Sequence, residues 1–526
     1  MTVLICSARG HDPQPYRIGM MNIRTNEDLQ RIADRLYRLI DDNAAQALIE
    51  ARQLRVNGEM RLSAQSLRAA ILIDGGGKCT DLFAVREGLK ILRRLVSKDF
   101  KNLGLRYNLA NGLSQLAKLE PYSDPEWYVT TRAERREARS LYLQVVNLTK
   151  SSDLKAQSLI NLGNELDSGY RWVEAYDTWV CALQVDPANS VAALSCARML
   201  LRRARYHKQL PFSDTRAAGY YARLAKRQSA GIEKFAGADA AKLAKSLPTF
   251  NSSWSPSPIH RIKDDFARFV ARHRLALVGT VEGLDLRKKR WDNVHIPSVL
   301  ETLNVRSGIP AVFAMFNQLK ADFCTARWLT YNFVKGTIKD TSLYMDTLDY
   351  ALYGTAPSIL ILGQRAALDI LDRVAVCANE YLATGQKPNE IQFRTFWREH
   401  DGAGTWKSWL KAEISTNNPG IIALGELASD LTEGGPLSPK HSMRNVSTHR
   451  FCVLHDLANT PSRESQGIEH HDIQFFFDHT IETLQIARSA ILYLLDVIAW
   501  RESCNRTNGL QSTMVVMPHH YIRGEK

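Results

Sequence analysis

The stretch from residue 159 to residue 187 constrains the fold of this chain most. Small and apolar residues recur there at helical spacing in two successive runs, Leu159, Leu162, Gly163, Leu166 and then Ala175, Trp179, Ala182, with Pro187 after them. Gly163 and the alanines allow two helices to approach closely, Trp179 fills the space between them, and Pro187 ends the second helix. One such helical hairpin cannot bury its own apolar face, so neighbouring hairpins are required.

This pattern, L-x2-LG-x2-L followed by A-x3-W and P, resembles the tetratricopeptide repeat, with Leu where the family usually has Trp and Tyr. A degenerate unit precedes it, with a long inter-helix segment at 121–131, and another begins near Ala193. Helical patterns at 28–39, 45–57 and 83–95 extend the stack toward the N-terminus. The sequence therefore predicts a repeat array, with a generic helical bundle as the alternative.

A segment rich in Ser and Pro, residues 247–262, cannot hold a helix and is expected to be a linker. It separates a TPR-like helical repeat domain, residues 1–246, from a second helical domain, residues 263–526. The second domain is expected to contain three long helices, at 311–334, 347–383 and 473–500, the middle one kinked or divided by Pro357. Residues 384–442 are polar with several Gly and Pro, and much of this stretch is expected to be loop. Alternating strand patterns are scarce, so the predicted fold class is all-α.

Composition limits the kinds of partner and the cellular compartment that suit this chain. The formal net charge of +13 favours a polyanionic partner, with RNA or DNA the first candidates, although a solvated basic surface is the simpler reading. The eight cysteines are scattered without C-x-x-C spacing, which is typical of reduced thiols in the cytosol. The N-terminal apolar run is too short for a signal peptide, and no apolar run is long enough to span a bilayer. We expect a cytoplasmic protein without a membrane partner.

The segment Arg444-Asn445-Val446-Ser447-Thr448-His449 is the strongest candidate for a catalytic site. Bare Arg/His pairs at this spacing also occur elsewhere, at Arg202/His207, Arg268/His273, Arg290/His295 and Arg450/His455. Only Arg444 is followed directly by Asn, Asp or His, and only this pair is expected at a loop-to-helix junction. On a helix that begins near Asn445, His449 shares a face with Val446, Val453 and Leu457. The alternative is a capped helix with a core histidine and a structural arginine.

The motif R-[N/D/H]-x3-H, together with the expected long helices, resembles the HEPN family, helical proteins that include prokaryotic toxin and antiviral ribonucleases. The resemblance covers roughly residues 300 to 505. It implies a helical bundle with Arg444, Asn445 and His449 as catalytic residues near the start of a late helix. It further implies RNA as the partner, tRNA among the candidates, and a homodimer in which two motifs face one cleft.

The chemistry of these groups agrees with cleavage of RNA without a metal or another cofactor. His449, with an unperturbed pKa of about 6.5, can accept the proton of a ribose 2′-hydroxyl near neutral pH. Arg444 can stabilise the pentavalent phosphorus that forms when the alkoxide attacks, and Asn445 can orient the imidazole or contact a phosphate oxygen. The products would be a 2′,3′-cyclic phosphate and a 5′-hydroxyl. DNA lacks the 2′-hydroxyl and would not be cut.

Three other stretches invite a functional reading. The run Glu469-His470-His471-Asp472 could suggest a metal site, but adjacent histidines on a helix point about 100° apart, so we expect a charge cluster at a helix start. The run Gly75-Gly76-Gly77-Lys78 lacks the spacing of a phosphate loop and is expected to be a turn. The basic run 287–290 is either an RNA contact or a solvated face.

The sequence as a whole predicts an endoribonuclease of the HEPN type, acting as a toxin or anti-phage effector and regulated by a protein or peptide trigger on its repeats. The alternative is a non-catalytic adaptor that uses the same two domains to bind RNA or a protein partner. A repeat-type transcriptional or signalling regulator is a further alternative, against which the absence of an evident helix-turn-helix counts.

Overall fold

The computed structural model of the 526-residue chain divides into two compact units. It describes all residues except 1–24, 55–59, 121–125, 204–211, 249–253, 257, 283, 285–291, 297, 301–308, 403, 440–449, 458–466, 508–512 and 516–526. Unit 1 comprises 1–168, 175–197 and 221–249, and unit 2 comprises 169–174, 198–220 and 250–526.

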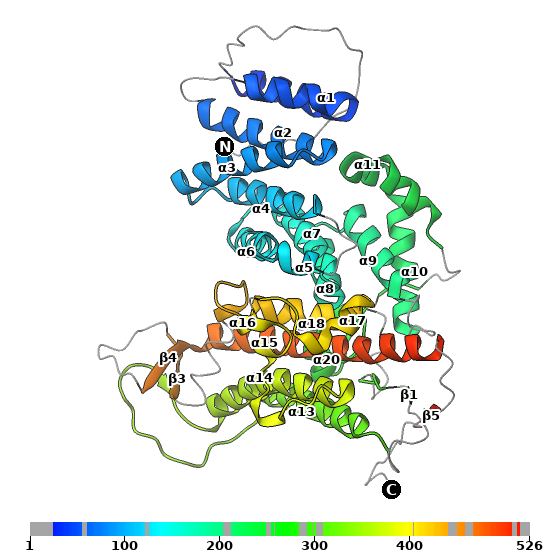
Figure 1. The fold of residues 1–526 in the computed structure, drawn as a ribbon. Helices are drawn as coiled ribbons and strands as arrows, with labels where there is room; N and C mark the ends of the chain where they lie inside the picture. The colour runs from blue at the N-terminus through cyan, green and yellow to red at the C-terminus, as the bar shows by residue number, and fades with distance from the viewer. Residues whose placement is uncertain are drawn as a thin grey trace. The chain divides into compact units, whose positions relative to one another are not determined.

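Unit 1 is a helical solenoid in which successive helices pack side by side (Figure 1). The helices that lie wholly within it are α1 (Asn26–Gln53), α2 (Arg61–Cys79), α3 (Leu82–Lys98), α4 (Leu103–Lys118), α5 (Trp127–Thr130), α6 (Arg132–Leu148), α7 (Ser152–Ser168) and α11 (Ser229–Ser246). Side-chain caps set several starts: the hydroxyl of Thr25 accepts from the backbone N–H of Asp28, and Asp28 accepts from that of Thr25.

The hairpin predicted at residues 159–187 forms from α7 and α8 (Trp172–Val185). A Cβ added to Gly163 would lie 2.4 Å from Nε1 of Trp179, so only glycine permits this approach of the two helices. The Trp179 side chain is 2% exposed, and its Nε1 donates to the carbonyl of Ile160 at 3.2 Å. The space-filling role expected of Trp179 is confirmed by these contacts.

Three helices contribute to both units: α8, α9 (Ser190–Arg203) and α10 (Phe212–Arg227). The first turn of α8, the end of α9 and the start of α10 belong to unit 2, and the remainder of each belongs to unit 1. The expected domains 1–246 and 263–526, with a linker at 247–262, therefore remain predictions about organisation, and the compact units are built from interleaved segments.

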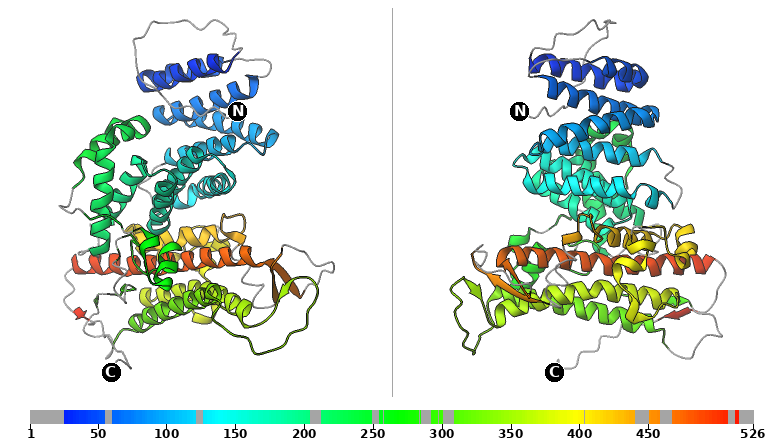
Figure 2. Two further views of the ribbon diagram at one scale, coloured as in Figure 1. Left: turned by 180° about the vertical axis from the view of Figure 1, so that it is seen from behind. Right: turned by 60° about the vertical axis from the view of Figure 1, so that its left-hand side comes forward.

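Unit 2 is a helical bundle around α20 (Ile473–Thr507). One side of α20 packs on α18 (Pro419–Asp430), and another packs on α13 (Ala311–Lys335) and α14 (Thr355–Leu382), as Figure 2 shows. The shorter helices of this unit are η2 (Ile259–Arg261), α12 (Asp265–Arg272), η3 (Pro388–Glu390), α15 (Phe393–Phe396), α16 (Glu399–Gly402), η4 (Ser408–Leu410) and α17 (Lys411–Ser415).

Two small sheets complete unit 2 within the described residues. β1 (Ser298–Leu300) pairs antiparallel with β5 (Thr513–Val515). In the other sheet, β3 (Phe451–His455) is the central strand, antiparallel to β2 (Ala351–Leu352) and parallel to β4 (Ile468–Asp472). Leu454 of β3 is fully buried in a cluster with Leu360 of α14 and Phe476 of α20, so the helical bundle covers one face of this sheet.

A buried ionic network joins the segments of unit 2. Arg171 is 2% exposed and pairs with Asp430 of α18, which is 1% exposed, and with Glu174 at 2.5 Å. Asp496 of α20 accepts from Nε1 of Trp172 at 2.5 Å and forms an ion pair with Arg203 at 3.2 Å. Because these charges are buried, each depends on its partner.

The long helices of unit 2 agree largely with the sequence, and three expectations are corrected, two in unit 2 and one in unit 1. The middle helix begins at Thr355 rather than 347, and Pro357 lies in its first turn, where proline is tolerated and does not kink the helix. The expected loop at 384–442 includes α18, all of whose twelve residues are buried. The expected turn Gly75-Gly76-Gly77-Lys78 is the last part of α2.

No helix in the part of the chain that the structure describes is long and apolar enough to cross a lipid bilayer.

Candidate functional site

The predicted catalytic residues Arg444, Asn445 and His449 lie outside the described residues, which resume at Arg450. Their geometry is therefore not part of the structure, and their roles stay predictions. The strand β3 begins at Phe451, two residues after His449 in the sequence.

The helix expected to run from Asn445 past Val453 is wrong over residues 451–455, which form β3. In a strand, successive side chains point to opposite faces, so the spacing argument that placed Val453 and Leu457 on a helical face with His449 fails. The physical reason is tertiary: the short run Phe-Cys-Val-Leu-His obtains both of its backbone partners, β2 and β4, from elsewhere in the chain.

The run Glu469-His470-His471-Asp472, expected at the start of a helix, lies in β4, and α20 follows directly. Asp472 accepts from the backbone N–H of Phe475 at 2.8 Å and so caps the first turn of α20. Because the histidines lie in a strand, they face opposite sides of the sheet. The 100° argument against a shared ligand set therefore does not apply to His470, which can combine with residues of other strands.

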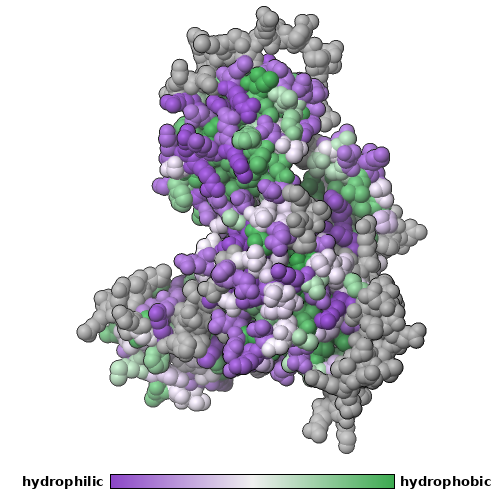
Figure 3. All heavy atoms as spheres, in the orientation of Figure 1, coloured by the Kyte–Doolittle hydropathy of each residue, from purple (hydrophilic) through white to green (hydrophobic). Residues whose placement is uncertain are grey.

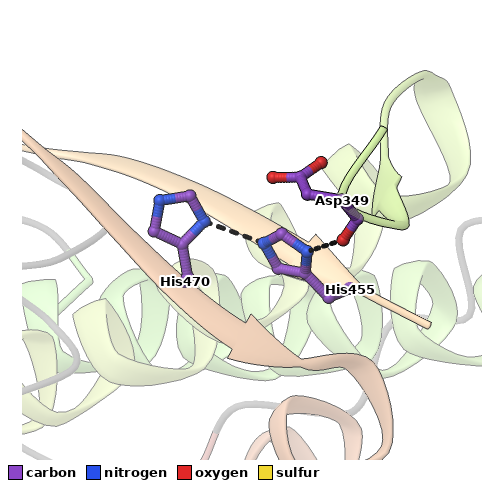
Figure 4. Close-up of side chains that lie close together, drawn as sticks. All are labelled: Asp349, His455 and His470. Carbon is purple, nitrogen blue, oxygen red and sulfur yellow. Dashed lines mark hydrogen bonds between the residues drawn. The ribbon is translucent and has the colours of Figure 1, made fainter. Parts of the chain in front are cut away.

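On the sheet face opposite the bundle, His470 meets two residues distant in sequence, Asp349 and His455 (Figure 4). Strand register explains the pairing of the histidines. His455 lies directly opposite Asp472, and His470 comes two residues before Asp472, on the same face. The ring nitrogens His455 Nε2 and His470 Nδ1 are 2.8 Å apart.

The segment before α14 brings Asp349 to this face. Asp340 accepts from the backbone N–H of Thr355 at 2.6 Å, which ties the segment to the first turn of α14. Leu348 and Tyr350, on either side of Asp349, both have positive φ, 59° and 60°. The backbone carbonyl of Asp349 then accepts from Nδ1 of His455 at 2.9 Å.

These contacts assign the hydrogens of the two imidazoles. A carbonyl oxygen only accepts, so Nδ1 of His455 carries hydrogen, and in the neutral ring Nε2 is then the acceptor. His470 Nδ1 must donate to it. Burial, and to a lesser extent the neighbouring His455, hold the pKa of His470 below its usual value, which keeps this ring neutral at neutral pH.

The carboxylate of Asp349 completes the group. The hydroxyl of Thr347 donates to it at 2.5 Å, and this bond is the main reason that the pKa of Asp349 lies below its usual value. The group thus offers a carboxylate and two imidazoles on one face of a sheet. Such a set can relay protons or hold a cation.

Apolar side chains are exposed on this sheet and on the segments that lead into and out of it. Large side chains are exposed there: Leu343 101%, Met345 85%, Leu348 87%, Phe451 76% and Phe475 57%. Figure 3 shows hydrophobic surface in this region, at the lower left of the view. Exposed apolar patches of this kind mark interaction surfaces.

Residues 303–501 match the model of a family described as LA2681-like HEPN. The match supports a HEPN domain in this part of the chain. It includes the long helices α13, α14 and α20, the sheet β2-β3-β4 and the segment 440–449. It covers less than half of the chain, and the N-terminal solenoid lies outside it. No curated protein matches the chain.

Sequence reasoning singled out His470 but missed its partners. His455 appeared only in a chance Arg/His spacing, and nothing near Asp349 suggested a site. The signal was absent because 106 residues separate Asp349 from His455 and only the pairing of β2 with β3 brings them together.

Proposed function

We propose that this protein cleaves RNA through the Arg444-Asn445-x3-His449 motif of its HEPN domain, without a metal ion. The observation that supports this most is that the region matched by the HEPN family model, 303–501, encloses the motif. HEPN domains are often ribonucleases, and the excess of basic residues, +13 in all, suits a polyanionic substrate.

His449 accepts the proton of the 2′-hydroxyl, and the resulting alkoxide attacks the adjacent phosphorus. Arg444 stays charged at all relevant pH values and stabilises the extra negative charge of the pentavalent transition state. The bond to the 5′-oxygen of the next nucleotide breaks, which leaves a 2′,3′-cyclic phosphate and a 5′-hydroxyl. Asn445 orients the imidazole or contacts a phosphate oxygen.

A homodimer would supply the second imidazole that proton transfer to the leaving oxygen requires. The exposed apolar side chains around the β2-β3-β4 sheet support association at this end of the domain, because one of them, Phe451 at the start of β3, follows the motif by two residues. We also propose that the solenoid of unit 1 binds the protein or peptide that triggers cleavage in a toxin or anti-phage response.

The test is cleavage of total tRNA by the purified full-length protein in EDTA, with mapping of the cut ends. Removal of a transition-state charge or a general base typically lowers the rate by 10²-fold or more, so we expect Arg444→Ala and His449→Ala each to lose at least that factor. Asn445→Ala should lose less. An oligonucleotide with a 2′-deoxyribose at the mapped cut should resist cleavage.

The matched controls are Arg268→Ala and His273→Gln, which alter an Arg/His pair of the same spacing without the asparagine and should keep the wild-type rate. If the two motif variants fold and cleave as fast as wild type, the motif is not catalytic. If wild type binds RNA with no cleavage under any condition, the adaptor reading is preferred. Light scattering of the same samples gives the mass that decides between monomer and dimer.

A further inference from the structure

The group formed by Asp349, His455 and His470 has the composition and proximity of a metal site. Each residue offers one donor atom, and the three donor atoms lie within 4.8 Å of one another. They come from three segments, the loop before β2, the end of β3 and β4 (Figure 4). A ligand held by all three would join parts of the chain that only the tertiary fold brings together.

His455 is presented as a metal-ligating histidine usually is. Its side chain is 1% exposed, and its Nδ1 hydrogen is engaged by the backbone carbonyl of Asp349 at 2.9 Å. A hydrogen bond on one ring nitrogen fixes the orientation of the ring and leaves the lone pair of the other nitrogen directed at the ligand. Here that lone pair, on Nε2, points at His470 and lies close to the Asp349 carboxylate.

We propose that Asp349, His455 and His470 bind one zinc-class divalent ion, through a carboxylate oxygen, Nε2 and Nδ1 respectively. Two imidazoles and one carboxylate are donors that Zn²⁺ and Co²⁺ accept, whereas Mg²⁺ and Ca²⁺ prefer sites made of oxygen alone. Three protein ligands leave a fourth position of a tetrahedral ion for water or a small anion.

The adjustment needed for binding is small. Two imidazole nitrogens on one tetrahedral zinc ion lie roughly 3.3 Å apart, given bonds of about 2.0–2.1 Å. The present separation of 2.8 Å must widen by about half an ångström. His470 must also carry its hydrogen on Nε2 instead of Nδ1, which changes no net charge because the ring is neutral in both forms.

The ion would act as a clamp on the sheet. It would tie the loop at Asp349 to β3 across 106 residues of sequence, and to β4 across a further 15. Binding itself does not depend on the proposed cleavage of RNA.

The test is whether untagged, metal-stripped full-length protein binds zinc. Calorimetry measures the binding, and elemental analysis after dialysis counts the bound ions. We expect one equivalent of zinc in wild type that is lost in Asp349→Asn and in His470→Gln. Zinc at about a hundredfold excess over Kd should raise the Tm of wild type by roughly 5 °C or more. Mg²⁺ and Ca²⁺ should not raise the Tm of wild type or of either variant. Co²⁺ should give the visible absorption of a tetrahedral site.

The matched control is His471→Gln, because His471 neighbours His470 on the strand but faces the other side of the sheet. It should keep the equivalent of zinc. Failure of wild type to bind zinc, or equal binding by wild type and the folded Asp349→Asn variant, would overturn the proposal and leave a hydrogen-bonded histidine pair. Arg444→Ala and His449→Ala should bind zinc normally, so failure of either proposal can be told from failure of the other.

Discussion

At the scale of single residues, burial lowers the pKa of three histidines in unit 2, His273, His470 and His471. His273 follows α12 and contacts the rings of Phe269 and Phe477, at centroid distances of 4.8 and 5.9 Å. Its burial, assisted by the positive charge of Arg272, lowers its pKa, and Asp478 opposes the shift only in part. Folding therefore disfavours the protonated form of this ring.

The pH dependence follows from that direction. The unfolded state binds a proton at His273 near pH 6.5 and the folded state only at lower pH, so this residue's contribution to stability is present above 6.5 and is lost as the pH falls through it. We expect the urea midpoint of wild type to fall between pH 7.5 and pH 5, and that of His273→Gln to fall less. His470 and His471 shift in the same direction, so some of the fall should remain. Identical falls in both proteins would contradict the assignment.

Residue chemistry also shows where prediction from sequence ends. The role of Trp179 against Gly163 was predictable because both lie in one local hairpin whose spacing is fixed by helical geometry. The meeting of Asp349 with His455 was not, because it depends on the pairing of β2 with β3 and on two residues with positive φ beside Asp349.

At the scale of secondary-structure elements, the seam between α18 and α20 depends on a single glycine, Gly420. A Cβ added to Gly420 would lie 2.3 Å from the backbone nitrogen of Val497 and 2.5 Å from the carbonyl oxygen of Tyr493. Backbone atoms of a helix cannot rotate away as a side chain can. The two helices would have to separate.

We therefore expect Gly420→Ala to lower the free energy of unfolding by about 3 kcal/mol or more, since overpacking against backbone outweighs the gain of about 1 kcal/mol in helix propensity. The matched control is Gly231→Ala in α11, where the nearest atom is the rotatable hydroxyl of Ser190 at 2.9 Å. It should change stability by less than about 1 kcal/mol. Chemical denaturation measures both, and equal effects would show that the seam tolerates a methyl group.

Helices and strands were predictable from sequence where a pattern within the element itself identifies them. The amphipathic helices α13 and α20 were predicted nearly to their ends. α18 was missed because it is buried on every side and so shows no amphipathic period, and its proline and glycines resemble a loop. β3 was missed because a run of five residues carries little periodicity and its partners lie elsewhere in sequence.

At the scale of the whole molecule, the HEPN domain depends on residues far upstream of the family match. Asp430 and Asp496 are buried in the bundle, and their partners Arg171, Trp172 and Arg203 all precede residue 204. Removing one partner of a buried ion pair typically costs about 3–5 kcal/mol, against a total stability of about 5–15 kcal/mol for a domain.

A fragment of residues 263–526, the domain expected from sequence, should accordingly fail to unfold cooperatively or should aggregate, although it contains the whole region of the HEPN match. A fragment of residues 169–526 keeps the network and should retain a cooperative transition for unit 2. Thermal unfolding followed by circular dichroism compares the two with the full chain. A cooperative transition of the shorter fragment at the full-length midpoint would show that the network is dispensable.

Because α8, α9 and α10 each contribute residues to both units, the position of a fusion junction decides whether unit 2 keeps all of its segments. A chimera that joins a foreign domain to the C-terminal part of this chain after residue 246 would discard the guanidinium groups that neutralise carboxylates inside unit 2. A junction placed ahead of Gly169 would transfer unit 2 with its own counterions.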